Sequence, residues 1–354
     1  MSAMATIKDV ALRARVSTAT VSYVINKTRF VSEELTGRVL QAIEELSFSP
    51  SKVAQSLRRG KSSIIGMVID DITNRFAAEF TKGLESVASA EQYSIIISDL
   101  HEDPANEPRA IGMLLDQMVD GIIYAGYGAA EDKLCEAFAD GLPVVTVDQP
   151  LPTCSLPSVL IDNKASAIAA LEHLESIGRT DIVFINGLQI NRNGLLRAEA
   201  FQQFMTQRGL PAGEERIIYG DYTLQHGYQS ALRLLKEKRS FNALFCGDDT
   251  IAFGAMAALK SRRVKIPEDV AVVGFDDDPM APVFEPSLTT VHYPIYEMGQ
   301  TSFRLFRKLV GRTRRRQEHI NLDTRLVVRR STNPRFEEYQ DLMAAPGEVL
   351  PTEP

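Results

Sequence analysis

Residues 16–26 read Val-Ser-Thr-Ala-Thr-Val-Ser-Tyr-Val-Ile-Asn, a pattern that predicts a short helix with two unlike sides. Ser17 can accept a hydrogen bond from a free backbone N–H group of the first turn and so begin this helix. Val21, Val24 and Ile25 lie on one side and are expected to point inward. The outward side carries small and hydrogen-bonding residues, namely Thr18, Ala19, Ser22, Tyr23 and Asn26.

The residues just before this stretch predict another short helix. Their apolar side chains recur at positions i, i+3, i+4 and i+7, in Ile7, Val10, Ala11 and Ala14. So tight a turn between two helices, here Arg15 to Ser17, is typical of a helix-turn-helix. A third amphipathic helix is expected from Ser32 to Ser47, with Ser32 as its N-cap. We therefore expect residues 1–48 to form an all-α helix-turn-helix headpiece.

The outward side chains of the central helix suit the major groove of DNA. Thr18 can donate or accept at a base edge, Ala19 can pack on a thymine methyl group, and Tyr23 can reach a base or a phosphate. Small helical domains without DNA-binding function show similar patterns, so the motif alone leaves both interpretations open.

The charge distribution favours DNA binding. Residues 1–62 contain ten Lys and Arg against five Asp and Glu, a balance of +5, whereas the whole chain carries −7 and the remainder therefore −12. A basic small domain on an acidic body is typical of a nucleic-acid-binding protein. The basic residues Arg58, Arg59 and Lys61 follow Ser49-Pro50, which is a favourable helix start because Pro suits the first helical position.

This region resembles the headpiece of the lactose-repressor (LacI/GalR) family. Within that family it is most similar to the purine and ribose repressors. The resemblance is carried by residues 5–11, 16–18, 20–22, 24–27, 29–31, 49–51, 54 and 56–57. It implies a sequence-specific transcriptional regulator, a repressor, that binds a palindromic operator as a homodimer. It also implies that residues 49–62 form a hinge helix and linker, with Leu57 wedged into the minor groove to kink the duplex.

The DNA-binding candidates come from this headpiece and hinge. They are Thr6, Ser17, Thr18, Ala19, Thr20, Ser22, Tyr23, Asn26, Arg29, Val53, Ala54, Leu57 and Arg58. Arg29, Arg58, Lys52 and Lys61 are expected to contact mainly phosphates. One departure from the family is Arg15, which stands where Gly is frequent. If this position is left-handed, Arg15 costs about 1 kcal/mol relative to Gly.

The composition excludes several other classes of protein. The three cysteines, Cys135, Cys154 and Cys246, are scattered and odd in number, so we expect ordinary thiols with no disulfide and no metal site. No signal-peptide pattern opens the sequence, and no apolar run reaches the ~18 residues that span a bilayer. We expect a cytoplasmic protein without a membrane segment, a catalytic site or a cofactor.

From Ser63 onward, strand and helix patterns alternate. Apolar runs such as Ile64 to Ile69 indicate parallel strands that are covered on both faces. The pattern predicts an α/β core of two doubly wound parallel-sheet subdomains, similar to the periplasmic-binding-protein-like core of the family. Subdomain 1 is expected at 63–161 plus 293–328, and subdomain 2 at 162–292, within a core of 63–331 that binds an effector and forms the dimer.

Three expectations concern the C-terminal part. The strand from Ile320 to Val328 is assigned to the first sheet. The basic run Arg312, Arg314, Arg315 and Arg316 is interpreted as a solvated loop. Residues 332–354 are expected to be a disordered tail, because they are rich in proline and acidic residues.

Ligands of such sheets bind beyond the carboxyl ends of the strands, where two facing sheets form a shared cleft. Carboxylates, an Arg and amides there, with aromatic side chains for stacking, suit a polyhydroxylated ligand. The effector-binding candidates are Phe76, Asp148, Asn191, Asn193, Arg197, Tyr222, Asp249 and Asp276. Other polar residues near strand ends are interpreted as loops or helix caps, namely Asp70, Asp71, Thr73, Asp162, Asp248 and Asp277.

The family resemblance assigns effector contacts to six of these candidates, Phe76, Asn191, Asn193, Arg197, Tyr222 and Asp276. Two departures bear on the ligand. Asn191 stands where the purine repressor has an Arg, and Gln149 where the purine and ribose repressors have a Trp. These departures favour a sugar or sugar derivative over a purine corepressor, which remains the alternative.

Two further alternatives are weaker. Gly126-Tyr127-Gly128, with Asp148 twenty residues beyond Gly128, imitates part of a dinucleotide fingerprint. Glu131 occupies the third glycine position, where its charge would crowd a pyrophosphate. A sugar-binding transport protein would share the core but have no use for the basic headpiece.

Overall fold

The computed structural model describes residues 5–48, 61–149, 151, 153–311, 318–333 and 335. The chain divides into two compact units, residues 1–63 and 64–354. Within the described residues, no helix is both long and apolar enough to cross a membrane. The expectations for the hinge, for the basic run Arg312 to Arg316 and for most of the tail lie outside the described residues.

The first unit contains the helix-turn-helix. Its helices are α1 (Ile7–Ala14), α2 (Thr18–Asn26) and α3 (Glu33–Glu45). Their buried side chains form one small core, made of Val10, Ala11, Ala14, Val21, Val39 and Ala42. Thr6 and Asp9 form a reciprocal capping box at the start of α1. Ser32 precedes α3 as expected, but its side chain makes no capping hydrogen bond.

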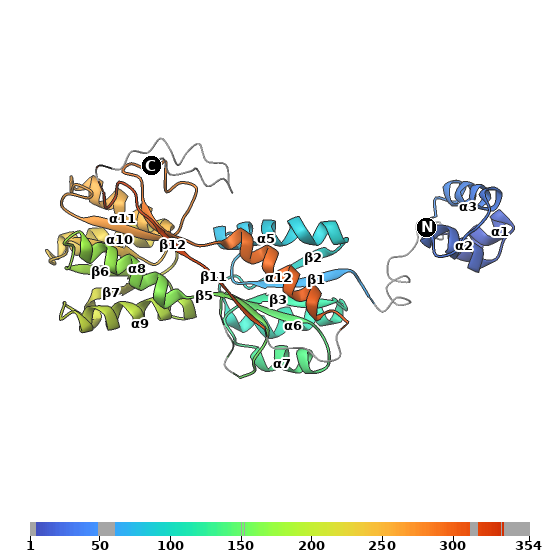
Figure 1. The fold of residues 1–354 in the computed structure, drawn as a ribbon, viewed down its shortest axis with the longest axis horizontal. Coiled ribbons are helices and arrows are strands. Elements are labelled where there is room, and N and C mark those ends of the chain that lie inside the picture. Colours follow the sequence, from blue (N-terminus) through green and yellow to red (C-terminus); the bar gives the residue numbers. More distant parts are fainter. Residues whose placement is uncertain are drawn as a thin grey trace, which may run out of the picture. The chain divides into compact units, whose positions relative to one another are not determined.

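The second unit contains two six-stranded sheets (Figure 1). The first has the order β11-β5-β4-β3-β1-β2 and the second β12-β10-β9-β8-β6-β7. The strands of the first sheet are β1 (Ile64–Ile69), β2 (Ser94–Asp99), β3 (Gly121–Ala125), β4 (Val144–Val147), β5 (Ser158–Ile161) and β11 (His319–Leu322). Those of the second are β6 (Ile182–Asn186), β7 (Ile217–Tyr219), β8 (Ala243–Cys246), β9 (Ala271–Asp276), β10 (Thr289–His292) and β12 (Arg325–Val327).

Helices cover both faces of each sheet, as the buried apolar strands at its centre, such as β1 and β3, require. On the first sheet, α5 (Arg75–Ala88) and α12 (Ile295–Leu309) lie opposite α6 (Glu107–Asp116) and α7 (Glu131–Ala139) (Figure 1). On the second sheet, α8 (Asn163–Ser176) and α9 (Arg192–Gln207) lie opposite α10 (Leu224–Lys236) and α11 (Asp249–Ser261). Short 3-10 turns occur at Ser89–Glu91, Pro104–Asn106 and Glu214–Arg216.

Close packing of α5 on α12 depends on glycine. A Cβ atom built on Gly83 would lie 2.0 Å from the carbonyl oxygen of Tyr296, and one on Gly299 would lie 2.3 Å from that of Phe80. Neither position has room for a side chain, so the two helix backbones can approach each other directly. This contact joins the returning C-terminal segment to subdomain 1.

The expectation for the strand from Ile320 to Val328 was wrong. It divides into β11, which pairs with β5 in the first sheet, and β12, which runs antiparallel to β10 in the second. The chain crosses between the sheets at Asp323 and Thr324, where Thr324 is within 2.7 Å of the Ser166 hydroxyl group. The sequence pattern alone does not show such a crossing, because the residues on both sides of it form strands.

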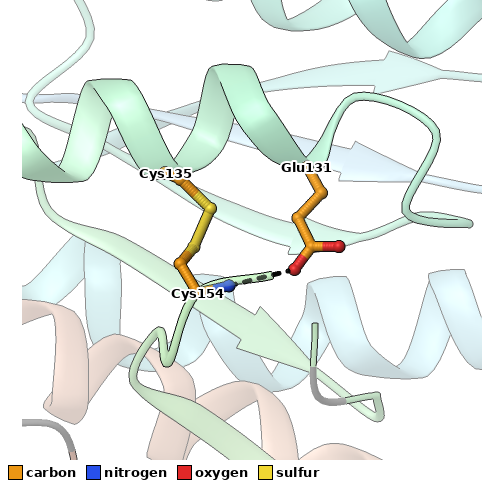
Figure 2. Close-up of side chains that lie close together, drawn as sticks. All are labelled: Glu131, Cys135 and Cys154. Carbon is orange, nitrogen blue, oxygen red and sulfur yellow. Dashed lines mark hydrogen bonds between the residues drawn. A yellow bond between two sulfur atoms is a disulfide. The ribbon is translucent and has the colours of Figure 1, made fainter. Parts of the chain in front are cut away.

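The expectation of three ordinary thiols was also wrong. Cys135 on α7 and Cys154, between β4 and β5, form a disulfide with a Cα–Cα distance of 6.0 Å (Figure 2). Cys246 is a free, buried thiol. The two bonded cysteines are 19 residues apart in sequence. They meet because α7 packs beside the strand β4, from which the Cys154 segment emerges.

Candidate DNA-binding surface and effector pocket

The first turn of α2 is held by its N-cap. The Ser17 hydroxyl oxygen accepts a hydrogen bond from the Thr20 backbone N–H at 3.0 Å and lies 2.9 Å from the Thr20 hydroxyl oxygen. Thr18 and Ala19 are exposed beside this cap. The helix therefore begins with two unobstructed side chains, which is the arrangement that base readout requires.

The remaining outward residues of α2 interact with their neighbours. Asn26 donates from Nδ2 to the Ser22 carbonyl oxygen at 2.8 Å and to its hydroxyl oxygen at 3.2 Å. The guanidinium of Arg29 lies 5.2 Å from the centroid of the Tyr23 ring. Tyr23 and Asn26 are partly exposed. The candidates Val53, Ala54, Leu57 and Arg58 lie outside the described residues.

A polar pocket lies between the two sheets at the carboxyl ends of their strands. Its lining follows β1, β3 and β4 of the first sheet and β6 to β10 of the second. The lining residues are Asp70, Asn74, Phe76, Ala125, Gly126, Tyr127, Val147, Asp148, Gln149, Asn191, Asn193, Arg197, Tyr222, Asp248, Asp276 and Tyr293. This is where the topology of parallel sheets places a ligand site.

Arg197 is the positively charged group of this lining. Its side chain is buried on α9, and Nε donates to the Asn163 side-chain oxygen at 2.9 Å while Nη1 donates to the Gly247 carbonyl oxygen at 2.6 Å. Its guanidinium carbon lies 3.5 Å from the centroid of the Phe275 ring. Nη2 makes no hydrogen bond to any described residue, so a rigidly held donor faces the pocket.

Asp148 joins the two sides of the pocket. It follows β4 of the first sheet and accepts hydrogen bonds from the Asn193 amide on α9 and from the Tyr293 hydroxyl group. Asn193 in turn accepts from Asn163 at 3.1 Å. Burial raises the pKa of Asp148, while the Tyr293 hydrogen bond and the Arg197 charge lower it. Asp148 and Asn193 therefore form a direct polar link between the subdomains.

Three more carboxyl groups face the pocket and have raised pKa values. Burial raises the pKa of Asp276 to about 8, despite the opposing effect of Arg197. Burial likewise raises the pKa of Asp70 to about 6 and that of Asp248 to about 6. The pocket thus holds four carboxyl groups and one guanidinium, and a carboxyl group that is protonated, as Asp276 largely is at neutral pH, can donate a hydrogen bond as well as accept one.

Aromatic rings form the apolar part of the lining. Phe76 and Tyr293 lie 5.9 Å apart between ring centroids. The Tyr222 ring lies directly on Gly187, where an added Cβ atom would be 2.0 Å from Cζ of the ring. Only glycine at this position leaves room for the Tyr222 ring, which lines the pocket.

The structure brings seven of the eight effector candidates into the pocket lining. The exception is Asp249, whose carboxylate accepts from the Thr290 hydroxyl group at 2.6 Å and from the Asp278 backbone N–H at 2.7 Å. Its neighbour Asp248 lines the pocket and also caps α11. Asp162 caps α8, as expected. Asp277 is neither a solvated loop residue nor a helix cap, because it forms largely buried ion pairs with Arg329 and His292.

Sequence reasoning missed several lining residues, among them Asp70 and Asp248, which it assigned to loops or caps, and Asn74, Tyr127 and Tyr293. The signal for Asp70 and Asp248 was their position just after buried strands. That position alone does not distinguish a ligand-binding residue, because many polar residues of loops and caps share it. Asn191 was expected to bind the effector and does line the pocket. It also has a structural role, because its side-chain oxygen caps α9 by accepting from the Gly194 N–H at 3.0 Å.

Comparison with known proteins relates both units to one group. Residues 6–51 match the model of the bacterial regulatory proteins of the lacI family, and residues 171–332 match a periplasmic binding protein-like domain. Catabolite control protein A of Priestia megaterium is 33% identical over 328 residues, covering 92% of this chain and 99% of that protein. The chain belongs to the LacI family.

Two further members illustrate the similarity. The HTH-type transcriptional repressor PurR of Erwinia tasmaniensis is 34% identical over 332 residues, covering 93% of this chain and 97% of its own. A crystal structure of the lac repressor dimer bound to operator and the anti-inducer ONPF has a TM-score of 0.83 and 25% identity, and the match covers 93% of this chain and 99% of that one. This LacI-family chain therefore has the DNA-binding and core domains of a transcriptional regulator.

Proposed function

We propose that this protein is a homodimeric repressor that binds a palindromic operator and is controlled by a neutral, polyhydroxylated effector such as a sugar. The observation that carries the proposal is the polar pocket, with the Nη2 donor of Arg197 and the carboxyl group of Asp276 in its lining. Two copies of α2, related by the dimer axis, would read half-sites about one helical turn apart.

The charges of the pocket support a neutral ligand. Hydroxyl groups can donate to the four carboxyl groups and accept from Arg197 at the same time. A phosphorylated sugar or a sugar acid would bring a further negative charge next to Asp70 and Asp248, whose pKa values of about 6 leave them largely ionised at neutral pH, which disfavours binding. A purine is disfavoured by the small amide of Asn191, half of which already caps α9.

The contacts of the Gly126 loop argue against a dinucleotide enzyme. The N–H groups of Tyr127 and Ala130 donate to the buried carboxylate of Glu107, and that of Gly128 donates to the Tyr124 hydroxyl oxygen. A pyrophosphate would need these same backbone donors. They are satisfied within the protein.

Control of DNA binding would operate through the contacts between the subdomains. Asp148 is bonded to Asn193 across the pocket, and Arg75 on α5 lies 3.3 Å from Asp278 of the second subdomain. An effector that binds Arg197 and Asp276 would change these contacts and thereby the angle between the subdomains. Such a coupling links the effector site to DNA binding through one two-state element.

The test begins with a thermal-shift screen against neutral sugars, sugar phosphates, sugar acids and purines. A ligand at 100 times its Kd stabilises the folded state by roughly 2.7 kcal/mol, which gives a clear shift in Tm. We expect a hit among neutral sugars. A hit confined to purines or to anionic sugars would contradict the proposed ligand class.

The Arg197→Ala variant should then lose the shift produced by the hit compound while still binding operator DNA. Arg192→Ala is the matched control, because Arg192 is an exposed residue on the same helix and does not line the pocket. An unchanged response in Arg197→Ala would remove Arg197 from the effector site.

A further inference from the structure

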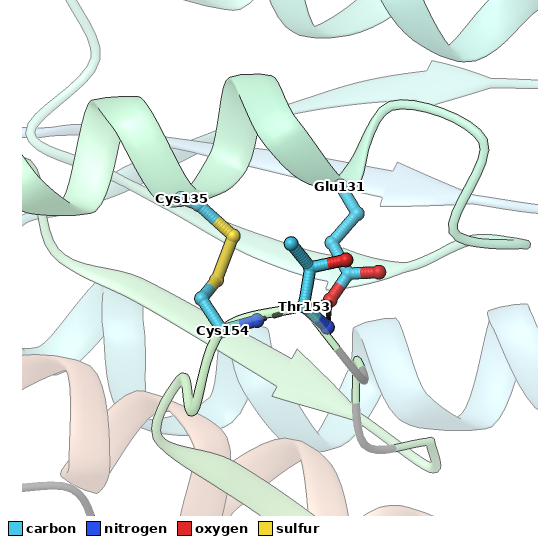
Figure 3. The surroundings of a disulfide bond; sticks show 4 residues. All are labelled: Glu131, Cys135, Thr153 and Cys154. Atoms are coloured by element: carbon cyan, nitrogen blue, oxygen red, sulfur yellow. Dashed lines mark hydrogen bonds between the residues drawn. A yellow bond between two sulfur atoms is a disulfide. The ribbon is translucent and has the colours of Figure 1, made fainter.

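A disulfide joins α7 to the segment that follows the pocket residue Gln149. Cys135 lies one turn after Glu131 on α7, and both side chains point at the segment that carries Thr153 and Cys154 (Figure 3). The buried Glu131 carboxylate accepts hydrogen bonds from the backbone N–H groups of Thr153 and, at 3.3 Å, of Cys154. One covalent bond and two hydrogen bonds therefore attach this segment to α7.

The attached segment is continuous with the pocket lining. Gln149, five residues before Cys154, lines the pocket. Between them, Leu151 is buried in the apolar cluster that also contains Ala130 and packs against Tyr127. A Cβ atom on Gly128 would lie 3.5 Å from a methyl group of Leu151, so the Leu151 side chain packs against the loop of Gly126 to Gly128. Gly126 and Tyr127 are themselves pocket residues.

The chemical setting makes a permanent disulfide unexpected. A repressor works where the chromosome is, and there low-molecular-weight thiols keep most cysteines reduced, so that disulfides are usually transient and redox-sensing. Both Cys135 and Cys154 are half-buried, whereas a fully buried pair would be closed to a small thiol or disulfide. The third cysteine, Cys246, is fully buried in β8 and takes no part.

We propose that Cys135 and Cys154 form a reversible thiol–disulfide site, and that its redox state sets how firmly the adjoining wall of the effector pocket is held. This inference extends the proposed function, since the wall is that of the proposed effector site. In the oxidised form the Cys154 segment is attached covalently. In the reduced form this covalent bond is absent, and the segment is held by noncovalent contacts, among them the Glu131 hydrogen bonds and the packing of Leu151.

The oxidant is a low-molecular-weight disulfide such as oxidised glutathione. The thiolate of one cysteine attacks a glutathione sulfur, which forms a mixed disulfide and releases one glutathione thiolate. The second cysteine thiolate then attacks the protein sulfur of that mixed disulfide and releases the other. Two protein thiols become one disulfide, the electron pair passes to glutathione, and the two protons appear on the two glutathione thiols. Excess reduced glutathione reverses each step.

A metal site is the competing interpretation of the same residues. One carboxylate oxygen of Glu131 and the two sulfur atoms lie within 4.8 Å of one another. A structural zinc site needs four ligands, and only these three come together among the described residues. The Glu131 carboxylate is also occupied by two backbone donors. The geometry therefore favours the disulfide.

The first measurement is a thiol count on the full chain after equilibration in glutathione buffers from fully reduced to fully oxidised. Alkylation in denaturant followed by intact mass should give three free thiols at the reduced end and one at the oxidised end, reversibly. Cys135→Ser should form no intramolecular disulfide in any buffer, and any thiol it loses should appear in the intact mass as an added glutathione, whereas the control Cys246→Ala should lose two thiols on oxidation as the parent does.

The second measurement is hydrogen exchange of both forms. In the peptide that contains Leu151, Thr153 and Cys154, we expect amide exchange to become about tenfold faster on reduction. The peptide around Tyr127 should change in the same direction, while peptides of α9 in the other subdomain should not. These readouts need neither DNA nor effector, so they can fail independently of the proposed function.

Four outcomes would overturn the proposal. Three thiols at every glutathione ratio would mean that no disulfide forms, and one thiol at every ratio would mean a permanent bond. One zinc ion per chain that protects two thiols until a chelator removes it would make this a metal site. Identical exchange in both redox forms would separate the disulfide from the pocket wall.

Discussion

Asp276 should make the stability of this protein depend on pH. Burial raises its pKa from an ordinary 3.8 to about 8. Because the folded state holds this proton more tightly than the unfolded chain, the free energy of unfolding falls as pH rises from 3.8 to about 8. Above that range the carboxylate is charged in both states, and the destabilisation is complete.

The Asp276→Asn variant should remove this destabilisation. Asn keeps the shape of the side chain and tolerates the positive φ of 105° at this position. In ligand-free protein we expect its Tm to exceed that of the parent by at least ~3 °C at pH 8, with the difference shrinking toward pH 5. Asp221→Asn, at an exposed position outside the pocket lining, is the control. A difference that stays constant with pH would show that Asp276 does not titrate as described.

Gly187 supports the pocket without contacting a ligand. Gly187→Ala would place a methyl group 2.0 Å from the Tyr222 ring, so the ring must move. We expect a loss of about 1–3 kcal/mol in the free energy of unfolding of the core, together with a smaller thermal shift from the effector. Gly112→Ala is the matched control, because nothing lies within 4 Å of the added atom. Denaturant unfolding of both variants would distinguish a specific clash from a general effect of alanine.

Among the elements, the turn between α1 and α2 carries identifiable strain. Arg15 has φ 53° and ψ 48°, so it adopts the left-handed conformation that glycine favours, and its backbone N–H donates to the carbonyl oxygens of Ala11 and Leu12. Arg38 donates to the carbonyl oxygen of Arg15 at 3.1 Å. The hydrogen bonds of this turn use the backbone of Arg15, so glycine could replace it without losing them.

Arg15→Gly should stabilise the headpiece by up to about 1 kcal/mol, since glycine adopts the left-handed conformation without cost. The measurement is hydrogen exchange of the amides in α1 and α2 of the full chain. Leu12→Gly, at an exposed position within α1, should have the opposite sign and destabilise the headpiece by about 0.5–1 kcal/mol. Faster exchange in Arg15→Gly would show that the turn gains more from the arginine than it loses in strain.

For the whole molecule, the division of charge predicts how DNA binding depends on salt. Residues 1–62 carry +5, while the rest of the chain carries −12. If a dimer contacts 6–10 phosphates, its affinity for DNA should fall by a factor of about 10³ or more between 50 and 200 mM salt. Fluorescence anisotropy with a nonspecific duplex measures this salt dependence of the affinity without knowledge of the operator.

Removing the headpiece should abolish this binding. The core from residue 64 is a compact unit of its own, so a chain of residues 64–354 is expected to fold and to keep its effector pocket. Its net negative charge should repel the duplex at every salt concentration. Residual DNA binding by this fragment would mean that the core contributes a nucleic-acid surface.

Much of the fold could be predicted from the sequence, because secondary structure follows from local periodicity. The stretch of residues 16–26 contains α2 (Thr18–Asn26), and the apolar run from Ile64 to Ile69 coincides with β1. The N-cap of α2 at Ser17 could be predicted for the same reason, because the cap and the N–H group that it accepts from are only three residues apart. Family resemblance added residues such as Arg197 and Asp276, which spacing alone would not have distinguished.

Tertiary structure decided the features that depend on distant segments. Asp248 and Asp249 are adjacent and chemically identical, yet one lines the pocket and the other is buried against Thr290. The C-terminal strand divides between two sheets because the chain crosses from one subdomain to the other. Cys135 and Cys154 meet because α7 packs beside β4. A sequence determines which side chains share a face of one element, but only packing determines which faces meet.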